Sequence, residues 1–238
     1  MSMNANVLPR SGMMGSVATA TSPRQTGVLA EAQGWDPENF AREQIRGLVR
    51  RVFLANTGKP VKQVAFSATE PGTDVGVICD QVGHALALET SGEVAIVSRN
   101  PPAPEMTQAQ IYPHYSGSSA IKACSTQIAA NLWRVPASGL RELSPEAATG
   151  RYWLWALAEL RNDFEYAVIH GPEAGASSES ALLGQLAEGI ILVIEAHNTR
   201  KATARKIKEM LEDSQSRILG TVLSERTFPV PEKLYRRL

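Results

Sequence analysis

The stretch from Ala68 to Gly76 is the part of the chain whose residue types and spacing could do chemistry. It follows a short apolar segment and reads Ala-Thr-Glu-Pro-Gly-Thr-Asp-Val-Gly. A phosphate-binding loop needs small residues that let backbone N–H groups reach phosphate, then a lysine and a Ser or Thr that reaches magnesium. The chain keeps the small residue and the Pro-Gly turn of such a loop, at Ala68, Pro71 and Gly72.

The polar half of that loop is replaced. Asp74, Val75 and Gly76 stand where the template has its second Gly, its Lys and its Ser or Thr. The carboxylates of Asp74 and Glu70 would face a phosphate with like charge, which costs about 4 kcal/mol for unit charges ~4 Å apart at intermediate dielectric. The sequence therefore predicts a loop with the frame of a nucleotide site and without the groups that bind magnesium and nucleotide.

The elements that must position this loop alternate between strands and helices. Several strands are apolar along their whole length, which is typical of a parallel sheet covered on both sides, with ligands at the carboxyl ends of its strands. We therefore predict an α/β fold, doubly wound, with helices on both faces of a mostly parallel sheet. The strands are expected at 62–68, 93–98, 131–136, 165–170, 189–196 and 217–224, and the helices at 36–55, 75–86, 120–130, 144–162, 177–187 and 199–213.

Length and composition set the domain organisation. With 238 residues, 43% of them hydrophobic and 20% charged, the chain can bury a substantial core. Residues 1–33 are rich in small and polar residues without periodicity and are predicted to be disordered, whereas 34–238 form one domain. Cys79 and Cys124 are too few for a disulfide scaffold, no Cys/His spacing indicates zinc, and no apolar run could span a membrane. We expect a reducing, cytoplasmic compartment.

The net charge is zero, but it is unevenly distributed along the chain. Residues 1–59 carry 7 Lys and Arg against 4 Asp and Glu, residues 60–198 carry 7 against 15, and residues 199–238 carry 10 against 5. An acidic middle is a poor platform for nucleic acid, which we exclude as a partner. The basic end could meet a membrane surface or an acidic partner, or it could be an ordinary solvated helix face.

Five motifs, taken together, resemble one family. In order and spacing they are similar to the cytoplasmic domain of the bacterial tyrosine kinases (BY-kinases) of capsule and exopolysaccharide synthesis, and the resemblance covers about residues 36–238. It implies a P-loop-NTPase-like fold. The motifs are Ser67–Gly72 (SATEPG), Glu43–Arg50 (EQIRGLVR), Asn131–Gly139 (NLWRVPASG), Glu165–Pro172 (EYAVIHGP) and Gly189–Arg200 (GIILVIEAHNTR).

The family's enzymes use ATP and magnesium, and the resemblance implies where their catalytic groups would fall. The lysine falls at Val75, the second-strand carboxylates around Ser98, and the fourth-strand aspartate at His170. Phosphoryl transfer works by placing cations and a base around the transferring group. We therefore predict no catalytic residue, no bound metal and no cofactor. His170 could be a substitute base, but a satisfied histidine at the edge of the core is the simpler interpretation.

The resemblance also implies an interface. Glu43 and Arg46 match the family's E-x-x-R-x-x-R helix, whereas Val49 takes the second Arg position and Arg50 lies beside it. These charges could pair with a neighbouring subunit; the simpler interpretation is a solvated charged face. Tyr235 stands alone where the family has a cluster of tail tyrosines, and it could accept phosphate or pack against the body.

The expected function is that of a catalytically inactive BY-kinase-like domain. It would regulate or support bacterial capsular or exopolysaccharide biosynthesis and export. Its implied partners are a membrane polysaccharide copolymerase or an active homologue, reached from the cytoplasmic side of the inner membrane, and it could form a homo-oligomer. One alternative is an active kinase or ATPase whose lost lysine is replaced by Arg99 or Lys122. Another is a positioning regulator of the ParA/MinD type.

Overall fold

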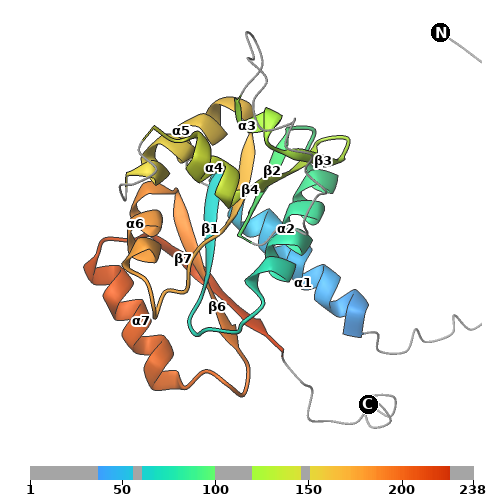
Figure 1. The fold of residues 1–238 in the computed structure, drawn as a ribbon. Helices are drawn as coiled ribbons and strands as arrows, with labels where there is room; N and C mark the ends of the chain where they lie inside the picture. The colour runs from blue at the N-terminus through green and yellow to red at the C-terminus, as the bar shows by residue number, and fades with distance from the viewer. Residues whose placement is uncertain (1–36, 56–60, 100–119, 146–150, 226–238) are drawn as a thin grey trace, which may run out of the picture. The chain divides into compact units, whose positions relative to one another are not determined.

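Seven strands form one sheet in the computed structural model, which describes residues 37–55, 61–99, 120–145 and 151–225. The strand order across the sheet is β3-β4-β2-β5-β1-β6-β7, and every neighbouring pair is parallel except β3 with β4 (Figure 1). The prediction of an α/β fold with a mostly parallel sheet is confirmed. The strands are β1 Gln63–Ala68, β2 Val94–Ser98, β3 Thr126–Ala129, β4 Leu132–Pro136, β5 Tyr166–His170, β6 Gly189–Glu195 and β7 Ile218–Ser224.

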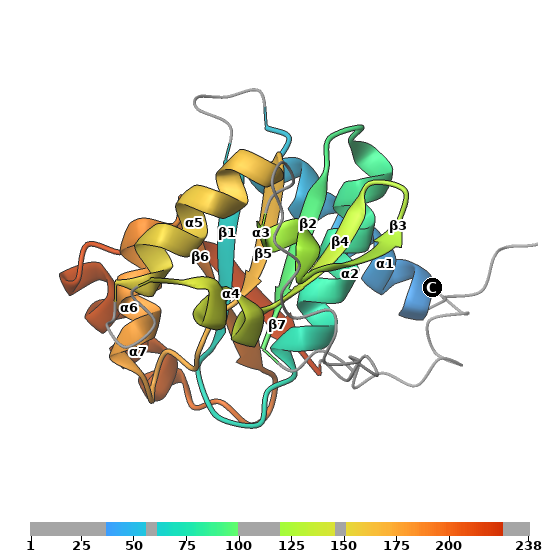
Figure 2. The same ribbon diagram turned by 45° about the horizontal axis from the view of Figure 1, so that its top comes forward.

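Helices cover both faces of the sheet (Figure 2). On one face, α1 and α2 bury Val49, Phe53 and Leu86 against β1, β2 and β5. On the other, α5, α6 and α7 bury Leu160, Leu183 and other apolar side chains. The helices are α1 Pro37–Val52, α2 Val75–Glu89, α3 Ala120–Ala123, α4 Ala137–Leu143, α5 Tyr152–Asp163, α6 Ser178–Leu186 and α7 Lys201–Asp213.

Helix α2, which follows the candidate loop, is fixed against the sheet along its length. At its middle, a Cβ placed on Gly83 would lie only 2.4 Å from the Cγ1 of Ile96 in β2, so a glycine is required for this close approach. At its carboxyl end, the Asn131 side-chain amide donates to the carbonyls of Ala87 and Thr90 at 3.1 and 3.0 Å. These contacts satisfy carbonyl groups that the end of a helix leaves without partners.

Two helix predictions are corrected. Only Ala120–Ala123 of the predicted helix 120–130 is helical, and Thr126–Ala129 instead pairs antiparallel with β4, which satisfies its backbone groups. Ser144, predicted to begin a helix, ends α4 instead, where its N–H donates to the carbonyl of Leu140 at 3.2 Å. The predicted segment 1–33 lies outside the described residues.

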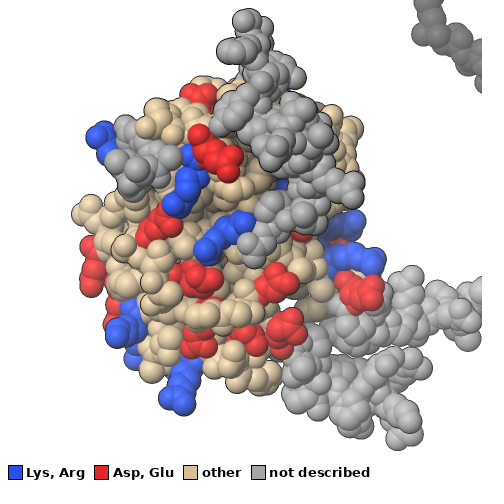
Figure 3. Space-filling view, viewed as in Figure 1, with Lys and Arg blue, Asp and Glu red and all other residues tan. Residues whose placement is uncertain are grey.

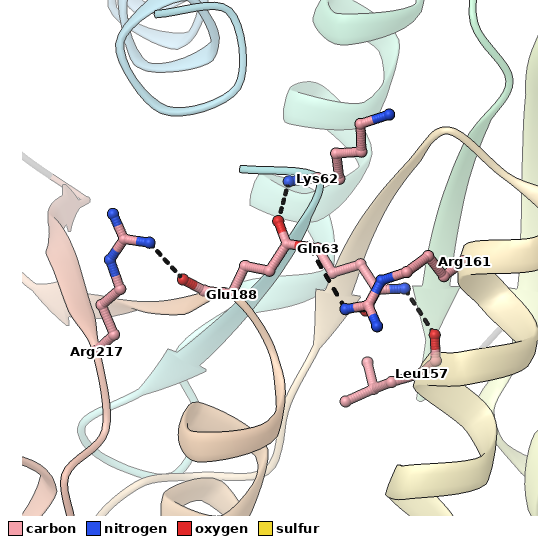
Figure 4. A network of polar contacts seen from close by, with 6 residues as sticks. All are labelled: Lys62, Gln63, Leu157, Arg161, Glu188 and Arg217. Atoms are coloured by element: carbon pink, nitrogen blue, oxygen red, sulfur yellow. Dashed lines mark hydrogen bonds and ion pairs between the residues drawn. The ribbon is translucent and has the colours of Figure 1, made fainter. Parts of the chain in front are cut away.

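A closed network of polar contacts joins α5, β1 and β6 at the amino end of the sheet (Figure 4). Gln63, which is 2% exposed, donates from Nε2 to the Leu157 carbonyl at 2.8 Å and accepts at Oε1 from Arg161 at 3.0 Å. Glu188 accepts from the backbone N–H of Lys62 and lies 3.4 Å from the Arg161 guanidinium. Each polar group of the buried Gln63 side chain thus has a partner, as buried amides require.

Candidate functional site

The candidate loop lies at the carboxyl end of the sheet, between the last residue of β1 and the first of α2. Ala68 and Thr69 are buried, whereas Pro71 and Gly72 form an exposed turn in which Gly72 has a φ of 91°. Such a positive φ favours glycine. The loop therefore has the small residues and the position that a phosphate-binding loop needs.

Asp74 caps the amino end of α2. Its Oδ1 accepts a hydrogen bond from the N–H of Val77 at 3.1 Å. The N–H groups at the start of a helix, together with the helix dipole, are what bind an anion such as phosphate. Here a carboxylate of the chain itself holds one of these N–H groups.

The next two positions place no cation and no hydroxyl at the loop. Val75 is 2% exposed and packs in the core cluster between α2 and the sheet. A Cβ added to Gly76 would lie 3.3 Å from Oδ1 of Asp74 and 3.7 Å from Nδ1 of His170. A side chain at this position would thus point between the aspartate and the histidine.

A second carboxylate flanks the loop from the end of β6. The Thr73 hydroxyl donates to Oε2 of Glu195 at 3.4 Å, and the Thr69 and Thr199 hydroxyls are 3.3 Å apart. The backbone N–H of Thr69 also donates to the Val193 carbonyl at 3.0 Å. Sequence reasoning missed Glu195. The one sequence feature that could have indicated Glu195 is its position: it is an acidic residue at the end of the most apolar strand, and ligands bind at that end of a parallel sheet.

Neither acidic position of the family motif carries a carboxylate here. Ser98 ends β2 opposite Pro136, and His170 ends β5 with its ring beside Gly76. Partial burial, reinforced by the positive charge of Arg99, lowers the pKa of His170 below its ordinary value. This shift favours the neutral imidazole over the imidazolium.

The two cations considered as replacements for the lysine lie at opposite ends of the sheet. Arg99 follows β2 at the carboxyl end and forms an ion pair with Glu173 at 3.6 Å. Lys122 pairs with Glu93, the residue before β2, and its ammonium lies 5.5 Å from the ring of Phe164, two residues before β5. Lys122 is thus at the amino end, across the sheet from the loop.

The three residues predicted as an interface are all on α1, and they are engaged differently. Arg46 pairs with Glu43 on the same helix at 2.7 Å. Arg50 instead bridges to α2, with its Nη2 2.6 Å from Oε1 and its Nε 3.0 Å from Oε2 of Glu89. Glu43 and Arg46 are exposed, so they remain accessible to a neighbour, whereas Arg50 already fastens α1 to α2.

The described residues contain no group of three or more His, Cys, Asp or Glu side chains arranged to hold a metal. Within the same part of the chain, no helix is long and apolar enough to cross a bilayer. On the face seen in Figure 3, acidic and basic side chains are interspersed and form no continuous basic surface. Tyr235 lies outside the described residues.

Comparison with known proteins gives relatives by sequence and neighbours by structure. No protein-family model matches the chain. The tyrosine-protein kinase CpsD of Streptococcus agalactiae serotype III is 30% identical over 74 residues, which are 31% of this chain and 32% of CpsD. The match thus spans about a third of the length of that relative. The tyrosine-protein kinase YwqD of Bacillus subtilis is 22% identical over 197 residues, 79% of this chain and 83% of YwqD.

The fold is shared with a solved structure. The chimerical protein CapA2B2 superposes with a TM-score of 0.57 at 18% identity, over 76% of this chain and 83% of that one. The two sequence relatives are both named tyrosine-protein kinases, and one of them aligns along most of its length. The resemblance predicted from the motifs is confirmed: the chain is similar to the bacterial tyrosine kinases, the BY-kinases.

Proposed function

We propose that this chain is a catalytically inactive BY-kinase-like domain that regulates or supports bacterial capsular or exopolysaccharide biosynthesis and export. The observation that carries the proposal is the hydrogen bond from Val77 N–H to the Asp74 carboxylate, at 3.1 Å. It puts a built-in anion where the family's loop would bind the phosphates of its nucleotide. The residues present do not fit magnesium and ATP, and we expect neither to bind as a cofactor.

Electrostatics support this proposal. Asp74 lies in the loop and caps α2, and Glu195 flanks the loop from the end of β6, where it accepts from Thr73. Each carboxylate would repel a phosphate ~4 Å away by about 4 kcal/mol at intermediate dielectric, before screening by water and salt. The buried Val75 occupies the position of the lysine that would offset this repulsion. A nucleotide would therefore meet net repulsion where the family's loop offers attraction.

The acid–base groups also argue against turnover. Phosphoryl transfer requires cations and a residue that accepts the proton of the attacking hydroxyl. His170 is the one titratable side chain at the former acidic positions, and its ring lies beside Gly76. Arg99 is the nearest candidate cation, and Glu173 pairs with it. An active kinase or ATPase would need both roles filled from elsewhere.

The role left to such a domain is to bind a partner. We propose either a membrane polysaccharide copolymerase or an active BY-kinase homologue, met at the cytoplasmic side of the inner membrane. The exposed Glu43–Arg46 pair on α1 is the surface we assign to that contact. Exposed charges at the rim of an interface mainly set association rate and salt dependence.

Calorimetric titration with Mg-ATP, together with an autophosphorylation assay, tests the inactive assignment. We expect no binding tighter than the millimolar range and no phosphate incorporated. The matched variant Asp74→Gly/Val75→Lys/Gly76→Ser restores the template and shows that the assay can detect binding on this scaffold. A micromolar dissociation constant for the unmodified chain, or incorporated phosphate, would contradict the proposal that the domain is inactive.

Co-purification with the copolymerase or an active homologue tests the partner assignment. Glu43→Ala/Arg46→Ala should weaken capture, most clearly at low salt. Glu38→Ala/Arg42→Ala is the matched control, because it removes another exposed ion pair, 3.1 Å long, from the first turns of the same helix. Equal capture of both double variants at every salt concentration would show that the Glu43–Arg46 pair is only solvated surface.

A further inference from the structure

Helix α7 carries an arrangement of charges that the packing of the fold does not explain. Ile207 and Leu211 hold the helix in the core cluster that α5 and α6 share, and α7 lies beside α6 (Figure 1). Its exposed side has cations in the first half and carboxylates in the second. The cations are Lys201, Arg205, Lys206 and Lys208, and the carboxylates are Glu209, Glu212 and Asp213.

The order of these charges opposes the helix dipole. The amino end of a helix carries partial positive charge and the carboxyl end partial negative charge, so anions stabilise the first turn and cations the last. The first turn of α7 has no acidic residue, its last turn has no basic residue, and its N-cap, Arg200, makes no side-chain capping bond. Lys201 and Arg205 are also like charges four residues apart, which destabilises a helix. This order of charges therefore lowers the stability of the isolated helix.

Four of the charges form a line along the helix, which we call the α7 stripe: Lys201, Arg205, Glu209 and Glu212. Residues three or four positions apart are neighbours on a helix surface, and the signs along the stripe are positive, positive, negative and negative. Glu212 pairs with Lys208, which flanks the stripe, at 2.6 Å. Within the described part of the chain, the other three stripe residues form no ion pair. Most of the stripe is thus available to a second molecule.

The α7 stripe is complementary to itself in one orientation. In an antiparallel pair of α7 helices about a two-fold axis near Ile207, Lys201 of each copy faces Glu212 of the other. Arg205 of each copy likewise faces Glu209 of the other. The same arrangement brings the positive end of each helix dipole beside the negative end of its neighbour. A parallel pair would place like charges side by side, which excludes that orientation.

We propose that α7 is a dimerisation helix, which pairs through the α7 stripe with α7 of a second copy of this chain, antiparallel about a two-fold axis near Ile207. Such an isologous contact uses the same surface on both copies and closes at two. It leaves the Glu43–Arg46 surface free, because α1 packs on the opposite face of the sheet. Exposed charge pairs contribute little each, so the dimer should dissociate on dilution and weaken as salt is added.

Sedimentation of the full chain from micromolar to millimolar concentration, at low salt, tests the pairing. Lys201→Glu/Arg205→Glu makes the stripe wholly negative, and Glu209→Lys/Glu212→Lys makes it wholly positive. Each variant alone should therefore raise the dimer dissociation constant at least about tenfold. An equimolar mixture of the two variants should dimerise again, because every facing pair then has opposite charges. That recovery also shows that both variants are folded.

Two single charge reversals provide the matched control. Arg205→Glu should weaken the dimer, whereas Lys206→Glu should change it much less, because neighbouring residues point about 100° apart around a helix. A monomer at all concentrations, or a mixture that associates no better than its components, would overturn the proposal. Dimerisation lost in Lys201→Glu/Arg205→Glu but kept in Glu209→Lys/Glu212→Lys would assign the cations to an acidic region outside α7 and overturn it as well.

Zero-length cross-linking with a carbodiimide, which joins a lysine amine directly to a carboxylate, tests the orientation. Within one copy, Lys201 and Glu212 are separated by about 16 Å along the helix, so a cross-link between them can form only between copies. The Lys208–Glu212 pair, 2.6 Å apart within one copy, is the positive control. We expect both cross-links, with Lys201–Glu212 confined to the dimer. A sedimenting dimer that gives only the Lys208–Glu212 cross-link would place the contact elsewhere and overturn the proposal.

Discussion

Polar side chains form a closed, partly buried network at one end of the sheet and lie beside water at the other. At the amino end, Gln63 and Glu188 are joined to α5 and to the start of β1 in a closed network, with Gln63 almost fully buried. At the carboxyl end, Asp74 and Glu195 lie at the loop with contacts of 3.1 and 3.4 Å. Removing one group from a closed buried network leaves its partners unsatisfied, whereas groups beside water can be rehydrated. The fold and the loop chemistry therefore depend on different ends of the same strands.

The largest expected effect is at the amino end. Gln63→Leu should lower the free energy of unfolding by about 1–3 kcal/mol, because the new side chain cannot bond to Arg161 or to the Leu157 carbonyl. Urea unfolding measures this change in the free energy of unfolding. Thr73→Ala at the carboxyl end is the matched control and should cost well below 1 kcal/mol, since its bond is long at 3.4 Å. Equal losses of unfolding free energy in the two variants would contradict the contrast between the two ends of the sheet.

The carboxyl end should respond in nucleotide binding. Asp74→Gly/Val75→Lys/Gly76→Ser removes the built-in anion and adds a cation and a hydroxyl, so Mg-ATP affinity should rise at least about tenfold, or 1.4 kcal/mol. Turnover should stay absent, because Ser98 and His170 still supply no carboxylate. Calorimetry and a phosphate-release assay separate the two. Rapid hydrolysis would mean that other residues already supply those roles.

A smaller effect concerns pH. Because burial and Arg99 lower the pKa of His170 in the folded state, the unfolded chain takes up a proton first as pH falls. Stability should therefore be complete above the ordinary histidine pKa of about 6.5 and decrease as pH falls through it, levelling off below the folded pKa. One proton sets an upper limit of about 1.4 kcal/mol per pH unit, reduced here by the partial exposure of the ring.

Urea unfolding at pH 7.5, 6.5 and 5.5 of the unmodified chain and His170→Gln isolates this contribution. The variant should lose less stability between the first and last pH than the unmodified chain. An identical pH profile for both proteins would show that His170 titrates alike in the folded and unfolded states.

The smallest effect is expected at the surface. Arg50→Ala removes the bidentate contact with Glu89, but water solvates both groups, so the urea midpoint should hardly move. Amide exchange in the last turn of α1 should increase, since this contact joins α1 to α2. Arg51→Ala on the same helix is the control, because it removes an exposed arginine of the same turn and leaves the Arg50–Glu89 contact in place. A midpoint shift as large as that of Gln63→Leu would contradict the ranking.

The sequence was sufficient where local patterns determine structure. The apolar strands, the Pro71–Gly72 turn and the start of α2 at Val75 were predicted within two residues, because period, turn chemistry and strand order agree there. The hairpin strand β3 was not predicted, since four mixed residues carry no clear period and only pairing with β4 makes them a strand.

The rest of the site could not be predicted from local sequence patterns, because it depends on contacts between residues far apart in the chain. Asp74 was interpreted only as a repulsive charge, although an aspartate before an apolar helix is also a typical cap. Glu195 reaches Thr73 from 122 positions along the chain, and Gln63 meets Arg161 across 98. No spacing rule within one element connects residues so far apart, and the fold alone brings them together.

The close contact at Gly83 constrains how α2 can move. With no side chain between them, helix and strand interlock at Ile96, so that sliding by even one residue would force a bulkier neighbour into the same space. The Asp74 cap fixes one end of the helix and Asn131 the other. A displacement of α1 that pulls on Glu89 therefore acts on a helix that cannot slide along β2.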